Sequence, residues 1–416
     1  MGMTITEKIL AKGSGLSEVH AGQIVTAKID LVMTQDASAP IAFEQFRELE
    51  IPVWDKKKIF VCIDHFTPAV TLARANTLKI SSDFARDYEI EHFFDTRGIS
   101  HQLICEGGHV LPGMVAVGAD SHTTTYGALG AFSTGIGSTE ACAVFATGEL
   151  WFRVPETIKV IVTGKLPEHV YAKDIILKLL SMIDANGATY KALEFTGETI
   201  SALSVDSRFT LCNMSVEGGA KNAIIAPDEK TIAYLEARGV RREDMDIFTS
   251  DSDAKYVQEI ALDVSGLDPY VAVPHSPANG VPVGEVAGLP LNQIIIGSCT
   301  NGRTEDFKIA AEIMRGHVIP RDIKCLIAPA SNRVYKELAD NGYLQVFADA
   351  GCVISHAGCN GCGIHALVNE GENCLSTNNR NYLGRMGSAK GSVYLSSPAT
   401  AAASAITGKL TDPRSL

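Results

Sequence analysis

Apolar residues along this chain fall into short β-branched runs that alternate with longer amphipathic stretches. Short apolar runs predict buried strands, which we place at 58–63, 114–117, 293–296, 324–328 and 393–395. We predict helices from 305 onward, at 332–342 and at 399–406, and a glycine-spaced helix from the strand at 114–117 to about Trp151. This alternation of strands and helices indicates an α/β fold.

Polar residues stand directly after three of the predicted strands. Asp64 and His65 follow the first of these strands, Asp120 and His122 follow the second, and Cys299 follows the third. In open α/β sheets, ligands bind at the carboxyl ends of the strands, where the strand-to-helix turns converge. These positions are therefore the first candidates for chemistry.

Length, composition and charge limit the class of protein. The 416 residues are enough for two or three domains, and 46% hydrophobic with 20% charged residues is typical of a soluble globular chain. The net charge of −12 disfavours nucleic acid and acidic membranes as partners. The chain has no apolar run of about 18 residues that could span a membrane. The N-terminus also lacks the pattern of a signal peptide, so we expect no membrane association and a cytoplasmic location.

The cysteines form one notable constellation. Cys359 and Cys362 make a C-x-x-C pair, and Cys299 lies sixty positions earlier. A C-x-x-C turn brings two thiolates to one side of a loop, which suits half a zinc site, a redox dithiol or an iron–sulfur cluster. Ten cysteines without an export signal indicate a reducing compartment. We expect the seven other cysteines to be core residues.

Six sequence blocks resemble the aconitase and isopropylmalate-isomerase family. They are VCIDHFTP, VGADSHTTTYGALGAFSTGIGSTE, TLCNMSVEGGAKNAIIAPDE, IIIGSCTNGRTEDF, AGCNGC and STNNRNYLGRMGS, in the order that the family has them. The resemblance implies three α/β domains with parallel-type sheets around a 4Fe–4S cluster that has one labile iron. Together with a composition shift near Glu156 and a Pro/Gly-rich stretch at 274–290, it predicts domains at 1–155, 156–278 and 279–416.

The resemblance also implies a hydro-lyase that dehydrates and rehydrates a hydroxy di- or tricarboxylate. In this family a fourth, swivelling domain lies either on the same chain or on a separate small subunit. This chain lacks the serine-serine-arginine stretch of that domain, so we expect a large subunit that pairs with a small one as a heterodimer or heterotetramer. Isopropylmalate isomerisation in leucine biosynthesis is the first expectation for the substrate. Homoaconitate and methylmalate- or citramalate-type substrates are the alternatives.

Roles for individual residues follow from the resemblance. The cluster ligands are expected to be Cys299, Cys359 and Cys362. The catalytic set is expected to be Asp64, His65, His101, Asp120, Ser121, His122 and Glu217. The substrate-binding set is expected to be Gln35, Asn213, Asn379, Arg380 and Arg385.

The chemistry of these residue types fits the implied roles. A carboxylate beside a histidine fixes the imidazole and favours its protonated form, which suits Asp64 and His65 as a proton-donating pair. An arginine fork binds a carboxylate through two hydrogen bonds. Two readings outside enzyme catalysis remain. A zinc-stabilised binding module would explain the cysteines but not the Asp-His and arginine blocks, and an RNA-binding relative would need a basic cleft.

Overall fold

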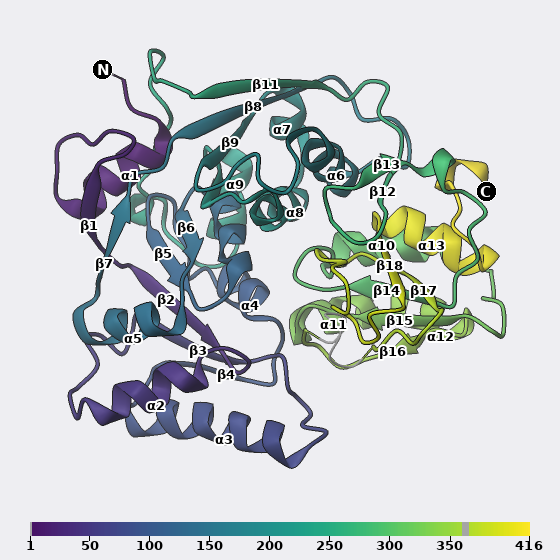
Figure 1. The fold of residues 1–416 in the computed structure, drawn as a ribbon, viewed down its shortest axis with the longest axis horizontal. Helices are drawn as coiled ribbons and strands as arrows, with labels where there is room; N and C mark the ends of the chain where they lie inside the picture. Colours follow the sequence, from purple (N-terminus) through teal and green to yellow (C-terminus); the bar gives the residue numbers. More distant parts are fainter. Residues whose placement is uncertain (1, 360–365) are drawn as a thin grey trace. The chain divides into compact units, whose positions relative to one another are not determined.

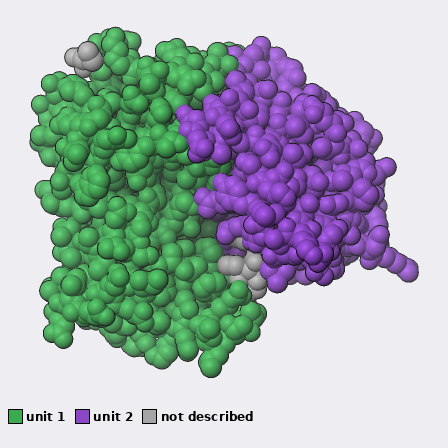
Figure 2. Space-filling model, viewed as in Figure 1, with its two compact units in different colours: residues 1–162, 188–261 green, residues 163–187, 262–416 purple. Residues whose placement is uncertain are grey.

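The computed structural model describes residues 2–359 and 366–416. The chain divides into two compact units, coloured separately in Figure 2. Unit 1 comprises residues 1–162 and 188–261, and unit 2 comprises residues 163–187 and 262–416. The predicted α/β class is confirmed, because each unit combines parallel strands with helices.

Unit 1 contains a parallel five-stranded sheet in the order β4-β3-β2-β5-β6 (Figure 1). Its strands are β2 (Leu31–Gln35), β3 (Ile59–Ile63), β4 (His92–Asp95), β5 (Val115–Gly118) and β6 (Phe132–Gly135). All residues of β2, β3 and β5 are buried, as expected for parallel strands that are covered on both faces. The predicted strands at 58–63 and 114–117 are confirmed.

The helices of this part of unit 1 are α1 (Ile5–Ser14), α2 (Pro40–Glu48), α3 (Leu72–Asp87), α4 (Ser100–Glu106) and α5 (Ser138–Thr147). Local sequence sets their starts: Thr4 and Glu7 form a capping box at α1, and Thr71 caps α3. Helices α2, α3 and α5 meet in an aromatic cluster, where the rings of Phe43 and Phe84 stack at 4.1 Å.

The single helix predicted from the strand at 114–117 to Trp151 is wrong. The structure instead has the 3₁₀ helix η1 (Ser121–Leu129), strand β6, helix α5 and strand β7 (Glu149–Arg153). Gly130 stops η1 in a left-handed conformation with φ +79, which lets the next residues pair with β5 as a strand. The mix of glycine and β-branched residues in this stretch hides the strand from a periodicity argument.

The rest of unit 1 is built on a four-stranded sheet in the order β10-β9-β8-β11. Its strands are β8 (Thr157–Thr163), β9 (Ala192–Thr196), β10 (Asn222–Ile225) and β11 (Gln258–Asp263), with helices α7 (Glu198–Ala202), α8 (Val205–Met214), η2 (Ser215–Gly218), α9 (Glu229–Glu236) and η3 (Arg242–Asp244). Strand β1 (Ile24–Lys28) pairs with β7 as a separate antiparallel ribbon. Helix α8 packs against η1, which joins the two parts of the unit.

Unit 2 contains a seven-stranded sheet in the order β13-β12-β18-β17-β14-β15-β16. The strands are β12 (Tyr270–Ala272), β13 (Gly280–Pro282), β14 (Gln293–Gly297), β15 (Lys324–Ala328), β16 (Val353–Ile354), β17 (Asn373–Ser376) and β18 (Ser392–Leu395). The pairs among β18, β17, β14, β15 and β16 are parallel, and β12 pairs antiparallel with both of its neighbours. The three strands predicted in this region are confirmed.

The helices of unit 2 are α6 (Ala172–Ile183), η4 (Val283–Glu285), α10 (Thr304–Met314), α11 (Asn332–Asp340), α12 (Tyr343–Asp349), α13 (Pro398–Thr407) and η5 (Pro413–Ser415). The predicted helices near 305, at 332–342 and at 399–406 correspond to α10, α11 and α13 and are confirmed. The cysteines expected in the core are buried, except that Cys352 is half-buried. Within the described residues, no helix is both long and apolar enough to cross a bilayer.

We keep the three-domain partition at 1–155, 156–278 and 279–416 as a proposal. The three main sheets take their strands from 31–135, 157–263 and 270–395, in that order along the chain.

Two histidines pack together at the edge of the five-stranded sheet. The ring of His92 stacks on Phe60 at 4.2 Å, and His109 lies 4.6 Å from His92 between ring centroids. Burial, and then the charge of His92, lower the pKa of His109 from 6.5 to about 4, and burial lowers the pKa of His92. Both rings are therefore neutral at physiological pH.

This pair predicts a loss of stability in mild acid. The unfolded chain protonates these histidines near pH 6.5 and the folded chain protonates His109 only near pH 4, so stability falls as the pH drops through that interval. The melting temperature of the His109→Phe variant should fall less steeply than that of the wild type between pH 6.5 and 4. The exposed His317→Gln control should keep the wild-type slope. Equal slopes for wild type and His109→Phe would contradict the assignment.

Candidate active site

Unit 1 gathers its candidate residues at the carboxyl ends of neighbouring strands. Gln35 ends β2, Asp64 and His65 follow β3, and Asp120 follows β5. Because β2 lies between β3 and β5, these strand ends are adjacent in the sheet. This is the arrangement that the sequence predicted for a ligand-binding edge.

Asp64 and His65 form a short carboxylate–imidazole pair. The Nδ1 atom of His65 lies 2.6 Å from Oδ1 of Asp64, and Oδ2 of Asp64 accepts a hydrogen bond of 2.7 Å from the backbone N–H of Ser100. Burial alone would lower the pKa of His65, but the adjacent Asp64 carboxylate outweighs it and raises the pKa to about 10. His65 is therefore an imidazolium at neutral pH, with Nε2 left to donate a proton.

Asp36 also belongs to this group, and the sequence analysis missed it. Its carboxylate accepts hydrogen bonds from the backbone N–H groups of Asp64, His65 and Phe66 at 3.0, 3.0 and 2.7 Å. The ligand atoms of Asp36, Asp64 and His65 lie within 4.8 Å of one another, a spacing that could hold a cation. We read the group as a hydrogen-bonded scaffold, because Asp36 is engaged by three N–H groups and Nδ1 of His65 by Asp64. Its signal in the sequence was its place beside Gln35 at the end of a strand.

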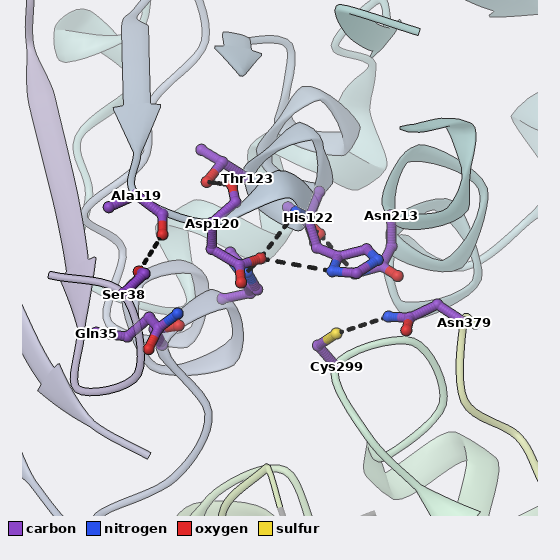
Figure 3. A network of polar contacts seen from close by, with 12 residues as sticks. Gln35, Ser38, Ala119, Asp120, His122, Thr123, Asn213, Cys299 and Asn379 are labelled. Atoms are coloured by element: carbon purple, nitrogen blue, oxygen red, sulfur yellow. Dashed lines mark hydrogen bonds and ion pairs between the residues drawn. The ribbon is translucent and has the colours of Figure 1, made fainter. Parts of the chain in front are cut away.

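A second network centres on Asp120 (Figure 3). Its Oδ1 atom lies 2.9 Å from Nε2 of His101 and accepts a 2.8 Å hydrogen bond from the backbone N–H of His122. The ring of His122 continues the network, because its Nε2 lies 2.8 Å from Oε1 of Glu217. Burial would raise the pKa of Asp120, but the hydrogen bonds from His101 and His122 hold it well below its usual range. Asp120 therefore stays ionised.

The Asp64–His65 pair and the Asp120 network lie close enough to interact, since the Asp120 carboxylate also helps to raise the pKa of His65. The remaining candidates of unit 1 lie around the Asp120 network. Ser121 opens η1, directly after Asp120. Asn213, on α8, donates a 2.8 Å hydrogen bond to Oγ1 of Thr125 in η1. Gln35 is buried, and its Oε1 accepts a 2.5 Å hydrogen bond from the backbone N–H of Ala37.

In unit 2, Cys299 lies in a tightly constrained loop between β14 and α10. Ser298 has the left-handed φ of +87, and a side chain at Gly297 would bring its Cβ to 2.2 Å from the carbonyl oxygen of Ala328. The buried guanidinium of Arg303 donates hydrogen bonds of 2.8 Å to the carbonyl oxygens of Cys299 and Thr300. These contacts hold the backbone of the loop at Cys299.

Asn379 contacts this thiol directly (Figure 3). Its Nδ2 group donates to Sγ of Cys299 at 3.2 Å, and both residues are buried. A donor aimed at a sulfur is typical of the surroundings of a metal-bound thiolate. Asn379 follows β17, the parallel neighbour of β14, so the two strand ends bring it to Cys299.

The other candidates of unit 2 differ in burial. Cys359 is buried, Arg380 is half-buried and Arg385 is exposed. Cys362 lies outside the described residues. Soft, buried thiols with an amide donor nearby fit an iron–sulfur or a zinc centre. A buried cysteine can also be a small core residue that binds no metal. Unit 1 thus holds the Asp64–His65 pair and the buried network around Asp120, and unit 2 holds buried thiols.

A family model matches most of the chain. The model described as the aconitase family (aconitate hydratase) matches residues 7–288 and 284–408. Among solved structures, the chain is similar to the crystal structure of Thermococcus kodakaraensis aconitase X in its holo-form. It has a TM-score of 0.51 and 13% sequence identity, and the match covers 92% of this chain and 94% of that chain. This likeness shows a shared fold.

Curated relatives match over their full length. The chain is 51% identical to 3-isopropylmalate dehydratase large subunit 1 of Methanopyrus kandleri, across 100% of this chain and 99% of the relative. It is 48% identical to the 3-isopropylmalate dehydratase large subunit of a Nitratiruptor species, across 100% of both chains. A probable large subunit from Methanothermobacter thermautotrophicus is also 48% identical across 100% of both chains.

Proposed function

Because this chain belongs to the aconitase family, we propose that it is the cluster-binding large subunit of a two-subunit hydro-lyase. The proposed reaction removes water from a hydroxy acid with two or three carboxylates and returns it at the adjacent carbon. The observation that carries the proposal is the short contact between Nδ1 of His65 and the Asp64 carboxylate at a strand end, in a chain that aligns from end to end with dehydratase large subunits.

We propose 2-isopropylmalate and 3-isopropylmalate as the substrate pair, which would place the enzyme in leucine biosynthesis. The similarity to large subunits with that name supports this choice. A homoaconitate or a methylmalate- or citramalate-type substrate is the alternative. The small partner subunit is proposed to contact the variable side group, so the large subunit alone does not decide between them.

We propose that Cys299, Cys359 and Cys362 hold a 4Fe–4S cluster with one iron that no protein residue binds. When bound, such a cluster supplies a Lewis acid that makes hydroxide a viable leaving group. The buried thiols of Cys299 and Cys359 and the amide donor of Asn379 support this assignment. Stoichiometric zinc remains the competing metal for the same thiols.

His65 is proposed to donate the proton that the departing hydroxyl takes up. Nε2 would transfer this proton, while Asp64 holds Nδ1–H and compensates the positive charge of the ring. A pKa of about 10 keeps this proton on His65 until the hydroxyl group leaves. In the hydration direction, the same atom would take the proton back from water.

The Asp120 network is proposed to orient the water molecule and to hold its protons. His101 and His122 both contact the Asp120 carboxylate, and Glu217 fixes the ring of His122. Ser121 and Asn213 are assigned to the Asp120 network, because Ser121 directly follows Asp120 and Asn213 contacts η1. The carboxylates of the substrate are proposed to bind Gln35, Asn379, Arg380 and Arg385, because arginine and amide donors match carboxylate oxygens. The small subunit is proposed to supply a serine as the base that removes the proton alpha to a carboxylate.

Anaerobic reconstitution and a substrate panel test this function. We expect about four irons and four sulfides per chain. With the small subunit added, the highest turnover in the panel should be on isopropylmalate rather than on homoaconitate or citramalate. Stoichiometric zinc without sulfide would refute the cluster. A loaded enzyme that prefers another hydroxy acid of the panel would refute the substrate and keep the reaction class.

A further inference from the structure

A fully buried lysine stands at the start of helix α6 in unit 2. Lys173 has 0% relative exposure and is the second residue of the helix, after the N-cap Tyr171. A positive charge is unfavourable at a helix N-terminus, because the helix dipole is positive there. Burial of an ammonium group adds a further cost unless acceptors surround it. A lysine at this place therefore needs specific partners.

Its partners come from two segments that are far apart in the sequence. Nζ of Lys173 donates hydrogen bonds to the carbonyl oxygens of Thr377 and Asn378 at 2.8 and 2.6 Å. It also donates to Oδ1 of Asn301 at 3.3 Å. The first two residues follow β17 and the third lies in the loop after β14, so one ammonium group joins the ends of two neighbouring strands.

A chain of hydrogen bonds in the loop after β14 links Asn301 to the backbone of Cys299. Nδ2 of Asn301 donates to Oδ1 of Asp306 at 2.9 Å, and the other oxygen of Asp306 accepts from the backbone N–H of Arg303 at 3.0 Å. The guanidinium of Arg303 then binds the carbonyl oxygens of Thr300 and Cys299. All these residues are buried, so water does not substitute for a lost contact.

The turn after β17 also contacts the thiol of Cys299. Thr377 is bonded through its hydroxyl group to the backbone of Gly297, at 2.9 Å to both N–H and carbonyl. Two residues further on, Asn379 donates to Sγ of Cys299. The Asn379–Cys299 contact therefore forms where the two segments meet, and the ammonium group of Lys173 ties these segments together.

We propose that Lys173 is a positioning residue that holds the turn at 377–379 against the loop at 297–303, so that Asn379 stays on the Cys299 thiol. Its relevance to catalysis rests on the proposed cluster-binding function. The structural part stands by itself, because every contact in it joins residues of this chain. Lys173 acts through the two segments and touches neither sulfur nor substrate.

Hydrogen–deuterium exchange of the cluster-free protein tests the structural part. In Lys173→Met, which keeps the length of the side chain and removes its charge and donors, exchange at 297–303 and 376–380 should become about tenfold faster or more. Exchange elsewhere in unit 2 should stay unchanged. The melting temperature should fall, because the carbonyl oxygens of Thr377 and Asn378 stay buried without the donor that they have in the wild type. Unchanged exchange at both segments would overturn the proposal. Faster exchange throughout unit 2 would also overturn it, because Lys173 would then stabilise the whole unit and not these two segments.

Lys178→Met is the matched control. Lys178 lies on the same helix, and its ammonium group sits over the ring of Tyr270 at 5.5 Å, a residue of β12 that belongs to neither segment. This variant should exchange like the wild type at 297–303 and 376–380. If it loosens these segments as much as Lys173→Met does, then loss of any α6 lysine is sufficient and the proposal fails.

Cluster stability provides the second measurement. Reconstituted Lys173→Met should lose iron in air several-fold faster than the wild type and Lys178→Met, because Asn379 no longer stays on the thiol of Cys299. A wild type that binds no cluster would refute the proposed function, and the exchange data would still decide the role of Lys173. Loaded variants that all lose iron at one rate would overturn the link to the cluster.

Asn301→Ala keeps the proposal testable if Lys173→Met does not fold. It removes the contact between the ammonium group and the 297–303 loop, together with the hydrogen bond from Asn301 to Asp306, and leaves the two carbonyl contacts in place. Exchange should then accelerate at 297–303 and much less at 376–380. Wild-type exchange at 297–303 in this variant would overturn the proposal.

Discussion

The His65→Ala variant is expected to lower the turnover of the two-subunit enzyme by about a hundredfold or more, with iron and sulfide content unchanged. The variant removes the Nε2 proton of His65, while Asp64 keeps its hydrogen bond from the backbone N–H of Ser100. Steady-state kinetics and iron analysis on the same preparation measure the two quantities. Exposed His317→Ala serves as the control and should match the wild type. A His65→Ala enzyme that has lost its iron would show that the residue is structural.

Asp64→Asn separates charge from geometry in the same experiment. The Asp64 carboxylate raises the pKa of His65 to about 10, so the activity of the wild type that depends on protonated His65 is lost only as the pH rises through that value. Without the carboxylate, burial dominates and lowers the pKa of His65. The alkaline limb of kcat should then move to lower pH. A limb at the wild-type position would assign it to another group.

The chain alone is expected to show no dehydratase turnover and to gain activity when the small subunit is added. Cooperating catalytic groups are strongly non-additive, so a proton donor without the proposed serine base leaves the barrier high. The small subunit should also exclude water from the reacting groups, which strengthens the charge interactions among them. Titration of one purified subunit against the other, with turnover as the readout, should saturate near one to one.

Two observations would contradict this expectation. Substantial turnover by the 416-residue chain alone would place a base within it and overturn the two-subunit proposal. A small subunit with its serine changed to alanine should bind at the same ratio and restore little activity. If it restores full activity, the base lies elsewhere.

The positions of the candidates at strand ends could be predicted from the sequence, because short apolar runs mark parallel strands and the next polar residues then share one edge. Asp64, Asp120 and Cys299 were found in this way, and their blocks also carry the family resemblance that the comparisons confirm. Roles of single residues stay proposals. The error at 121–151 arose because the β6 sequence has too few apolar residues to mark a strand.

Asp36 and Lys173 were missed for different reasons. Asp36 binds backbone N–H groups, and any acidic loop residue could do so, so its type carries no signal. Lys173 lies in an amphipathic helix, where a lysine is normally a solvated surface residue. Its partners are 128 to 205 positions away, and only the folded sheet brings them together.

The order β3-β2-β5 at the edge of the five-stranded sheet has an evolutionary consequence. Each of these strands is followed by a separate loop that carries its own polar group. The strands themselves pair through backbone hydrogen bonds. One loop can therefore be replaced or lengthened without a change in the register of the others. A lineage built on this frame can therefore vary one loop at a time and keep the polar groups that the other strands present.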